Sequence, residues 1–99
     1  MSKYKNGKIY TLVNKNDSSL IYVGITIQTL SERFKKHIYD YKRGRMLSSL
    51  LYSHIIDEYD WDEWNIYLYM DYPCNSLKEL QNKELEVIKQ IGLLNKEYY

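Results

Sequence analysis

The stretch Leu20–His37 constrains the fold of this chain more than any other, because it predicts a strand followed directly by a helix. β-Branched and aromatic residues crowd the segment Leu20–Ile27, which is typical of a strand. Thr29 and Glu32 then match a capping box, in which two side chains satisfy free backbone N–H groups at the start of a helix. The stretch therefore predicts a strand, a short turn at Gln28 and a helix from about Thr29 to Lys42.

This predicted helix places two reactive side chains beside its apolar stripe. Four apolar residues recur with a period of 3.6 and predict the face that meets the core: Leu30, Phe34, Ile38 and Tyr41. Arg33 and His37, four residues apart, line the edge of that face. Gly24 lies inside the preceding strand, where a missing side chain usually marks a bulge or the close approach of a backbone or ligand. A cation and a titratable imidazole near a strand glycine indicate a candidate site.

The rest of the chain predicts a single α+β domain over residues 1–99. Ninety-nine residues can build one modest core but not two. The expected order is β-β-α-α-β-α, a small, mostly antiparallel three-stranded sheet flanked by three helices. Besides the strand and helix above, the pattern predicts a strand at Lys8–Val13, a turn at Asn14–Ser19, a helix at Ser48–Tyr59, a strand at Asn65–Met70 and a helix at Ser76–Ile91.

Composition excludes a few classes of protein. Hydrophobic residues make up 44% and charged residues 27%, as in an ordinary globular domain, and no run of 18 apolar residues predicts a membrane span. The first residues are polar and lack the apolar region of a secretory signal. Cys74 is the one cysteine and cannot form an internal disulfide. We therefore expect an intracellular protein that is not secreted and does not enter a membrane.

Charge is distributed unevenly although the net charge is only +1. Residues 33–45 carry six cations and one anion, whereas residues 57–63 carry five carboxylates and no cation. A polyanion would approach the first surface and avoid the second. The alternative is two solvated faces that balance each other. On the first interpretation the expected nucleic-acid contacts are Lys35, Lys36, Lys42, Arg43 and Arg45.

The last predicted helix carries a carboxylate on its apolar face. At about 100° per residue, this face collects Leu77, Leu80, Val87, Ile88 and Ile91, with Glu84 in its middle. A carboxylate that faces a core is costly unless a cation, a hydrogen-bond network or a metal receives it. The alternative is a structural salt bridge or a partly exposed glutamate at the margin of the helix.

Together these features suggest phosphodiester chemistry. A glutamate such as Glu84 can hold Mg²⁺, or Mn²⁺ in its place, because these ions keep several waters and take further oxygens from a phosphate. An arginine such as Arg33 can neutralise the charge of a pentacovalent transition state. A base must take a proton from water, and His37 or a tyrosine near a cation could do so.

The motifs, in order, resemble those of the GIY-YIG nuclease domain. Lys8–Tyr10 and Tyr22–Gly24 correspond to the two signature triplets, with lysine in place of the first glycine. Leu30–His37 resembles the family's helix segment, Lys83–Lys89 its metal-binding helix and Leu94–Asn95 its late asparagine motif. Each motif is weak alone, but five in order over nearly the whole chain are a strong signal. The spacing resembles most closely the phage intron-encoded homing-endonuclease branch.

This resemblance implies a role for each site residue. Tyr10 would be the general base, and Tyr22 would bind the attacking water or the phosphate by a hydrogen bond. Arg33 and a metal would lower the pKa of Tyr10, and His37 could accept its proton. Glu84 would be the only protein ligand of the metal, and Asn95 would orient its neighbours. The alternative for both tyrosines is cross-strand aromatic packing.

Three functions remain open from the sequence. The first, implied by the resemblance, is a metal-dependent DNA endonuclease that leaves 5′-phosphate and 3′-hydroxyl ends, with a partner or a homodimer for double-strand cleavage. The second is a nucleic-acid-binding module of the same fold that does not cleave. The third is an interaction protein whose acidic residues 57–63 bind a basic partner.

Overall fold

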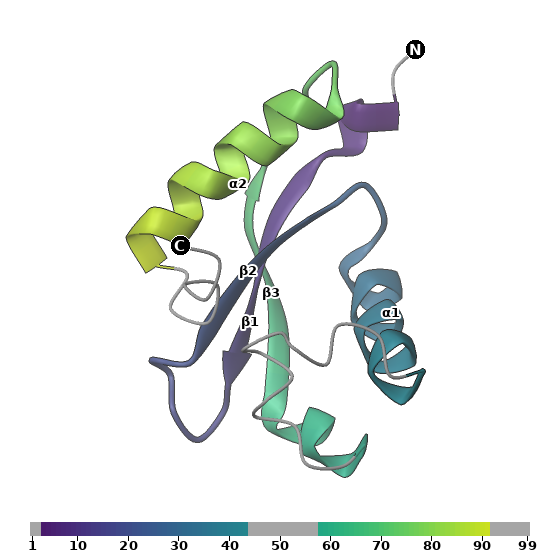
Figure 1. The fold of residues 1–99 in the computed structure, drawn as a ribbon, viewed down its shortest axis with the longest axis vertical. Helices are drawn as coiled ribbons and strands as arrows, with labels where there is room; N and C mark the ends of the chain where they lie inside the picture. Colours follow the sequence, from purple (N-terminus) through teal and green to yellow (C-terminus); the bar gives the residue numbers. More distant parts are fainter. Residues whose placement is uncertain (1–2, 44–57, 92–99) are drawn as a thin grey trace.

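The computed structural model describes residues 3–43 and 58–91, the side chains of 58–60 excepted, and shows a small sheet between helices (Figure 1). The elements, in order, are the 3₁₀ helix η1 (Lys3–Asn6), strands β1 (Lys8–Asn14) and β2 (Ile21–Thr26), helix α1 (Leu30–Lys42), the 3₁₀ helix η3 (Glu58–Glu63), strand β3 (Trp64–Asp71) and helix α2 (Leu77–Ile91). Among these residues, no helix combines the length and apolar character needed to cross a membrane. The α+β class and the three strands are confirmed.

Strand β1 lies at the centre of the sheet, in the order β2-β1-β3, and pairs antiparallel with both neighbours. The β1–β2 turn forms because the Asn14 side chain accepts hydrogen bonds from the N–H groups of Asn16 and Asp17. Tyr10 on β1 is paired with Gly24 on β2 and with Leu68 on β3. This register places Gly24 directly beside the centre of the sheet.

Side chains of β1 alternate between two cores, one on each face of the sheet. Tyr10 and Leu12 pack on the face that α1 covers, together with Trp61 and Trp64. Ile9 packs on the opposite face, against α2 residues Leu80, Val87 and Ile88. Figure 1 shows α1 and α2 on opposite sides of the strands. Residues from the two helices can therefore meet only at an edge of the sheet.

Helix α1 begins where the sequence predicts. Thr29 is its N-cap: the Thr29 hydroxyl accepts from the Glu32 N–H at 3.2 Å, and the Glu32 carboxylate accepts from the Thr29 N–H at 3.1 Å. Helix α2 has a related start, in which the Ser76 hydroxyl accepts from Glu79 N–H but the Glu79 carboxylate accepts from Asn75 N–H. Both starts are local devices that the sequence encodes directly.

The expected third helix is not confirmed. Its range, 48–59, falls mostly on residues 44–57, which lie outside the described residues, and its last two residues belong to η3. The acidic segment expected to lead into the third strand is itself helical, and it contributes the buried ring of Trp61 to the core. The rings of Phe34 and Tyr41 on α1 make edge-to-face contacts with Trp61. Trp61 belongs to η3, so η3 packs against α1 and helps to hold it on the sheet.

Candidate active site

Tyr10 lies at the centre of the site, fully buried on β1. A Cβ atom at Gly24 would stand 2.2 Å from both Cζ and Oη of Tyr10, closer than any side chain could come. Glycine is therefore required opposite Tyr10, because the phenol lies across the backbone of β2. The sequence indicated a close approach at Gly24, and the approaching group is this tyrosine side chain.

The hydroxyl of Tyr10 is hydrogen-bonded to the side chain of His37. The Tyr10 Oη lies 2.7 Å from Nε2 of His37, which reaches the sheet from α1. Burial, and to a lesser degree the charge of Arg33, lowers the pKa of His37 to about 3, while Asp40 opposes this shift. The imidazole is therefore neutral, and its Nε2 shares a hydrogen bond with the phenol.

Burial also controls the acidity of Tyr10. It raises the pKa of Tyr10 well above the ordinary value, and this effect exceeds the opposing charge and hydrogen bond of Arg33. The sequence predicted that Arg33 lowers this pKa; it does, but desolvation dominates. At neutral pH the Tyr10–His37 pair is thus uncharged.

Aromatic rings surround His37, which is deeper than the helical pattern predicted. Its exposed fraction is 3%, whereas the sequence placed it at the margin of the core. The Tyr22 ring, half-buried on β2, stands perpendicular to the imidazole with centroids 5.6 Å apart, and the Trp61 ring lies 6.2 Å away. Sequence reasoning missed Trp61, because it lies within a run of carboxylates.

Arg33 is the electrostatic centre of the site. It lies one helical turn before His37, is half-buried, and holds its guanidinium carbon 5.8 Å from the centre of the Tyr10 ring. Its charge lowers the pKa of Tyr10, of His37 and of Glu84. One cation thus acts on groups supplied by β1, α1 and α2.

Glu84 brings α2 into the same cluster. It is half-buried, one turn after Leu80 and one before Ile88, two residues of the apolar face. Burial raises the pKa of Glu84 to about 7, against the opposing charge of Arg33, and the charge of Glu84 in turn raises that of Tyr10. Tyr10, Arg33, His37 and Glu84 therefore form one electrostatic cluster across three elements.

The donor set of this cluster suits a hard, hydrated ion. Within residues 3–43 and 58–91, no group of three or more His, Cys, Asp or Glu side chains could enclose a metal. Glu84 is a single carboxylate that lacks full charge compensation, since its pKa remains raised. Mg²⁺ fits such a site because it retains waters and binds through one or two carboxylates plus substrate phosphate.

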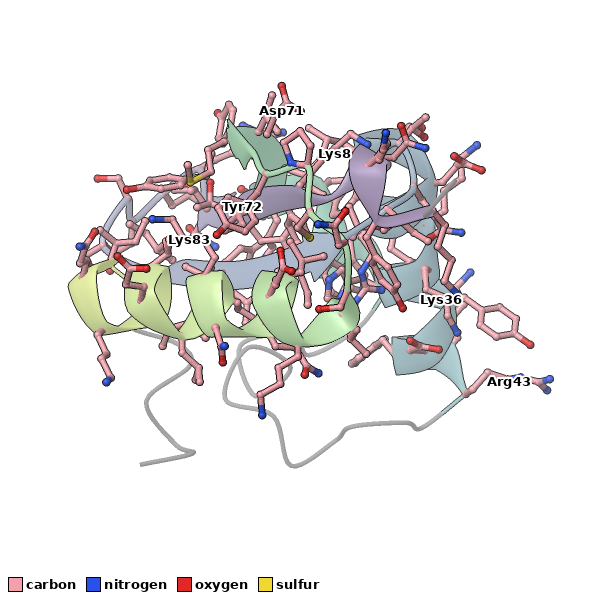
Figure 2. All side chains as sticks on the ribbon, turned by 90° about the horizontal axis from the view of Figure 1, so that it is seen from above. Lys8, Lys36, Arg43, Asp71, Tyr72 and Lys83 are labelled. Atoms are coloured by element: carbon pink, nitrogen blue, oxygen red, sulfur yellow. The ribbon has the colours of Figure 1, made fainter. Side chains whose placement is uncertain are left out.

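Four of the five predicted nucleic-acid contacts lie on α1 or at its C-terminal end. Lys35, Lys42 and Arg43 are exposed, and Figure 2 shows Arg43 extending away from the helix. Lys36 already pairs with Asp40 at 2.9 Å, so part of its charge is neutralised. Arg45 and Asn95 lie outside the described residues.

Comparison with known proteins identifies the family. The sequence model of the family described as the GIY-YIG catalytic domain matches residues 6–97 of this chain. The chain belongs to the GIY-YIG family. It is thus a GIY-YIG-type endonuclease. The fold is similar to that of the catalytic domain of the homing endonuclease I-TevI, with a TM-score of 0.66, 19% identity, and 90% and 92% of the two chains covered. No curated protein sequence matches the chain.

The first signature triplet carries Lys8 where the family has glycine. The half-buried Lys8 side chain turns back and donates from Nζ to the carbonyl of Asn6 at 2.9 Å. The close approach occurs one residue earlier: a Cβ at Gly7 would lie 2.7 Å from the Tyr72 carbonyl oxygen. The backbone contact that glycine permits is therefore made at Gly7, and Lys8 is accommodated.

Proposed function

We propose that this endonuclease hydrolyses phosphodiester bonds in DNA with a divalent ion, Mg²⁺ or Mn²⁺, held by Glu84, and leaves 5′-phosphate and 3′-hydroxyl ends. The observation that carries the proposal is the convergence of Tyr10, Arg33, His37 and Glu84 in one cluster. When bound, the ion would polarise the phosphate and neutralise charge on the leaving oxygen.

Tyr10 and His37 act together as the base. As Tyr10 Oη accepts a proton from the attacking water, it gives its own proton to Nε2 of His37 along their existing 2.7 Å hydrogen bond. The phenol stays neutral throughout, so the raised pKa of Tyr10 is not an obstacle to this transfer. The charge of Asp40 favours the imidazolium that forms, whereas burial and the charge of Arg33 oppose it.

Arg33 and Tyr22 bind the reacting phosphate. The guanidinium is fixed beside Tyr10 and can donate to the negative oxygens of the pentacovalent transition state. Tyr22 is half-buried, so its hydroxyl can reach the water or the phosphate. Asn95 is proposed to orient these groups.

A plasmid assay tests this function. Wild-type protein should nick supercoiled DNA with Mg²⁺ and not with a chelator, and DNA ligase should reseal the nick because the ends are 5′-phosphate and 3′-hydroxyl. Glu84→Ala should abolish nicking, whereas Glu86→Ala should not, because that carboxylate on the same helix is 62% exposed. Salt-dependent DNA binding without nicking by the wild type would support the non-cleaving module instead.

A further inference from the structure

A cavity of about 480 Å³ opens beside the catalytic cluster, and Arg33 is the one lining residue that the proposed reaction uses. It lies where β2 turns into α1, between α1, the first turns of α2 and η1. In Figure 2 the N-terminal end of α2 (light green) lies on the same side of the view as the Lys36 side chain of α1. The volume falls in the range of small-ligand sites.

The cavity is continuous with the catalytic cluster along three elements. Arg33 belongs to both. Thr26 lines the cavity two residues after Gly24, and so on the same face of β2, about 7 Å along the strand. Leu80 lines it one helical turn before Glu84. If the phosphate of a DNA strand is bound at Glu84 and Arg33, the nucleotide next to that phosphate would therefore enter the cavity.

The lining combines an apolar floor with a cationic rim. Ile27, Leu77 and Leu80 supply apolar surface, and the Tyr4 ring adds an aromatic face. The rim carries Lys3, Lys36 and Arg33 against one anion, Asp40, which is paired with Lys36. Apolar and aromatic surface suits a base, and a cationic rim suits its phosphate.

The wall at η1 is held in place by backbone hydrogen bonds. The Tyr4 carbonyl accepts from the N–H groups of Gly7 and Cys74, both at 3.0 Å, and the Gly7 carbonyl accepts from Tyr72 N–H at 2.8 Å. These contacts fix η1 against the connection from β3 to α2. The η1 wall of the cavity is thus held in place by the protein itself, without a ligand.

We propose that this cavity receives one unpaired nucleotide of the substrate strand, next to the scissile phosphate. Its base lies against Tyr4 and Leu77, and its phosphate binds Arg33 and Lys36. A base that is paired and stacked cannot enter a pocket, so the nucleotide must be unpaired or extruded from the duplex. The inference rests on the proposed function and adds a substrate class: DNA with an unpaired nucleotide beside the cleaved bond.

Nucleotide binding without metal tests the proposal separately from cleavage. ¹H–¹⁵N spectra of the Glu84→Ala protein in chelator are recorded with thymidine 5′-monophosphate, with thymidine, and with inorganic phosphate. We expect the nucleotide to shift the amide signals of Thr26, Gln28 and Leu77, and each fragment alone to shift fewer of them. Shifts with phosphate equal to those with nucleotide would overturn the proposal, since the cavity would then be an anion site only.

A matched pair of variants identifies the cavity. Leu77 lines it and is 44% exposed, whereas Leu85 on the same helix is 46% exposed and does not line it. Leu77→Glu should weaken nucleotide binding about tenfold, which corresponds to about 1.4 kcal/mol, and Leu85→Glu should leave it unchanged. Equal affinity in the two variants would contradict the proposal.

Cleavage by the wild type separates the two proposals. Wild type should cut a duplex with one unpaired nucleotide beside the cleavage position faster than the fully paired duplex, and Leu77→Glu should remove this preference. Plasmid nicking without nucleotide shifts at the cavity would overturn this inference and leave the proposed function standing. Nucleotide shifts without any nicking would overturn the proposed function instead.

Discussion

Gly24 shows how one missing side chain sets the geometry of the site at the scale of single residues. The Tyr10 phenol occupies the space where a Cβ at Gly24 would be, and this position brings its hydroxyl to His37. The signature glycine is therefore a steric requirement of the tyrosine that we propose as part of the base, in addition to any approach of the substrate.

Replacing this glycine should damage stability and cleavage together. Gly24→Ala places a methyl group against the Tyr10 ring, so we expect a loss of about 1–3 kcal/mol in the free energy of unfolding, as for other overpacked cores. Urea unfolding measures it. In a Tyr10→Ala background the same substitution should cost little, since the obstructing ring is gone. Additive losses in the double variant would show that the ring is not the reason for the glycine.

The carboxyl of Glu84 should make the metal-free protein less stable as pH rises. Its pKa is about 7 in the folded state against 4.5 in the unfolded state, so unfolding releases its proton between these values. Stability should therefore fall from pH 4.5 to 7 and level off above, by about 1–2 kcal/mol after allowance for partial exposure. Unfolding in chelator at a series of pH values measures this loss.

Two variants isolate the contribution of Glu84. Glu84→Gln should lose this decline, and Glu86→Gln should retain it because that carboxylate is exposed. His37 contributes an opposite slope from pH 3 to 6.5, since its pKa is lowered, but equally in all three proteins. An unchanged decline in Glu84→Gln would contradict the raised pKa.

The sequence predicted which residues form the candidate site, but not which residues of other elements surround them. Tyr10, Arg33, His37 and Glu84 were recognisable from motif order and from their positions on predicted faces, and the structure brings all four together. Periodicity states which face of an element a residue occupies, not which residue of another element it meets. The depth of His37 and the burial that governs the pKa of Tyr10 therefore could not be predicted.

At the scale of elements, α1 carries Arg33, His37 and the exposed cations, so the residue at which it begins determines where these side chains point. The capping box was predictable because all its partners lie within four residues. The 3₁₀ helix η3 was not, because its five surrounding carboxylates indicated a solvated segment and concealed the buried Trp61. The local capping signal predicted the start of the helix correctly, whereas the burial of Trp61 within an acidic run could not be predicted from the sequence.

Removing the cap of α1 should destabilise the protein moderately. Thr29→Ala deletes the acceptor of the Glu32 N–H and should cost about 1 kcal/mol in the free energy of unfolding. Thermal or urea unfolding measures it. Ser31→Ala, two residues later on the exposed surface of the same turn, is the matched control and should change little. Equal effects of the two substitutions would argue against the cap.

At the scale of the whole molecule, the two helices lie on opposite faces of the sheet, and their charged groups meet beside β2. β2 is an edge strand, so a site built around Gly24 can be open to a polymer substrate. The class of fold and the positions of the three strands along the chain followed from alternation and helix signals, whereas their order in the sheet was not predicted. Most of the range 48–59, where a further helix was predicted, lies outside the described residues.

The exposed cations at the end of α1 should position DNA without affecting chemistry. On the Glu84→Ala background, replacing Lys42 and Arg43 by alanine should reduce the dependence of log affinity on log salt by up to about two units, because each cation neutralises about one phosphate. A salt titration of DNA binding measures the slope. Replacing Lys78 and Lys89, exposed on α2, is the control and should leave the slope unchanged. Equal slopes for both pairs would place the duplex elsewhere.

The rate of a single cleavage event on a labelled DNA duplex, at saturating protein and Mg²⁺, tests most directly the claim that Glu84 supports phosphodiester hydrolysis. Three proteins are compared: wild type, Glu84→Gln and Glu86→Gln. Glu84→Gln should cleave about 10²-fold more slowly or worse, by analogy with loss of one transition-state interaction, while binding DNA normally. Glu86→Gln should cleave at the wild-type rate. Cleavage by Glu84→Gln at the wild-type rate would contradict the account.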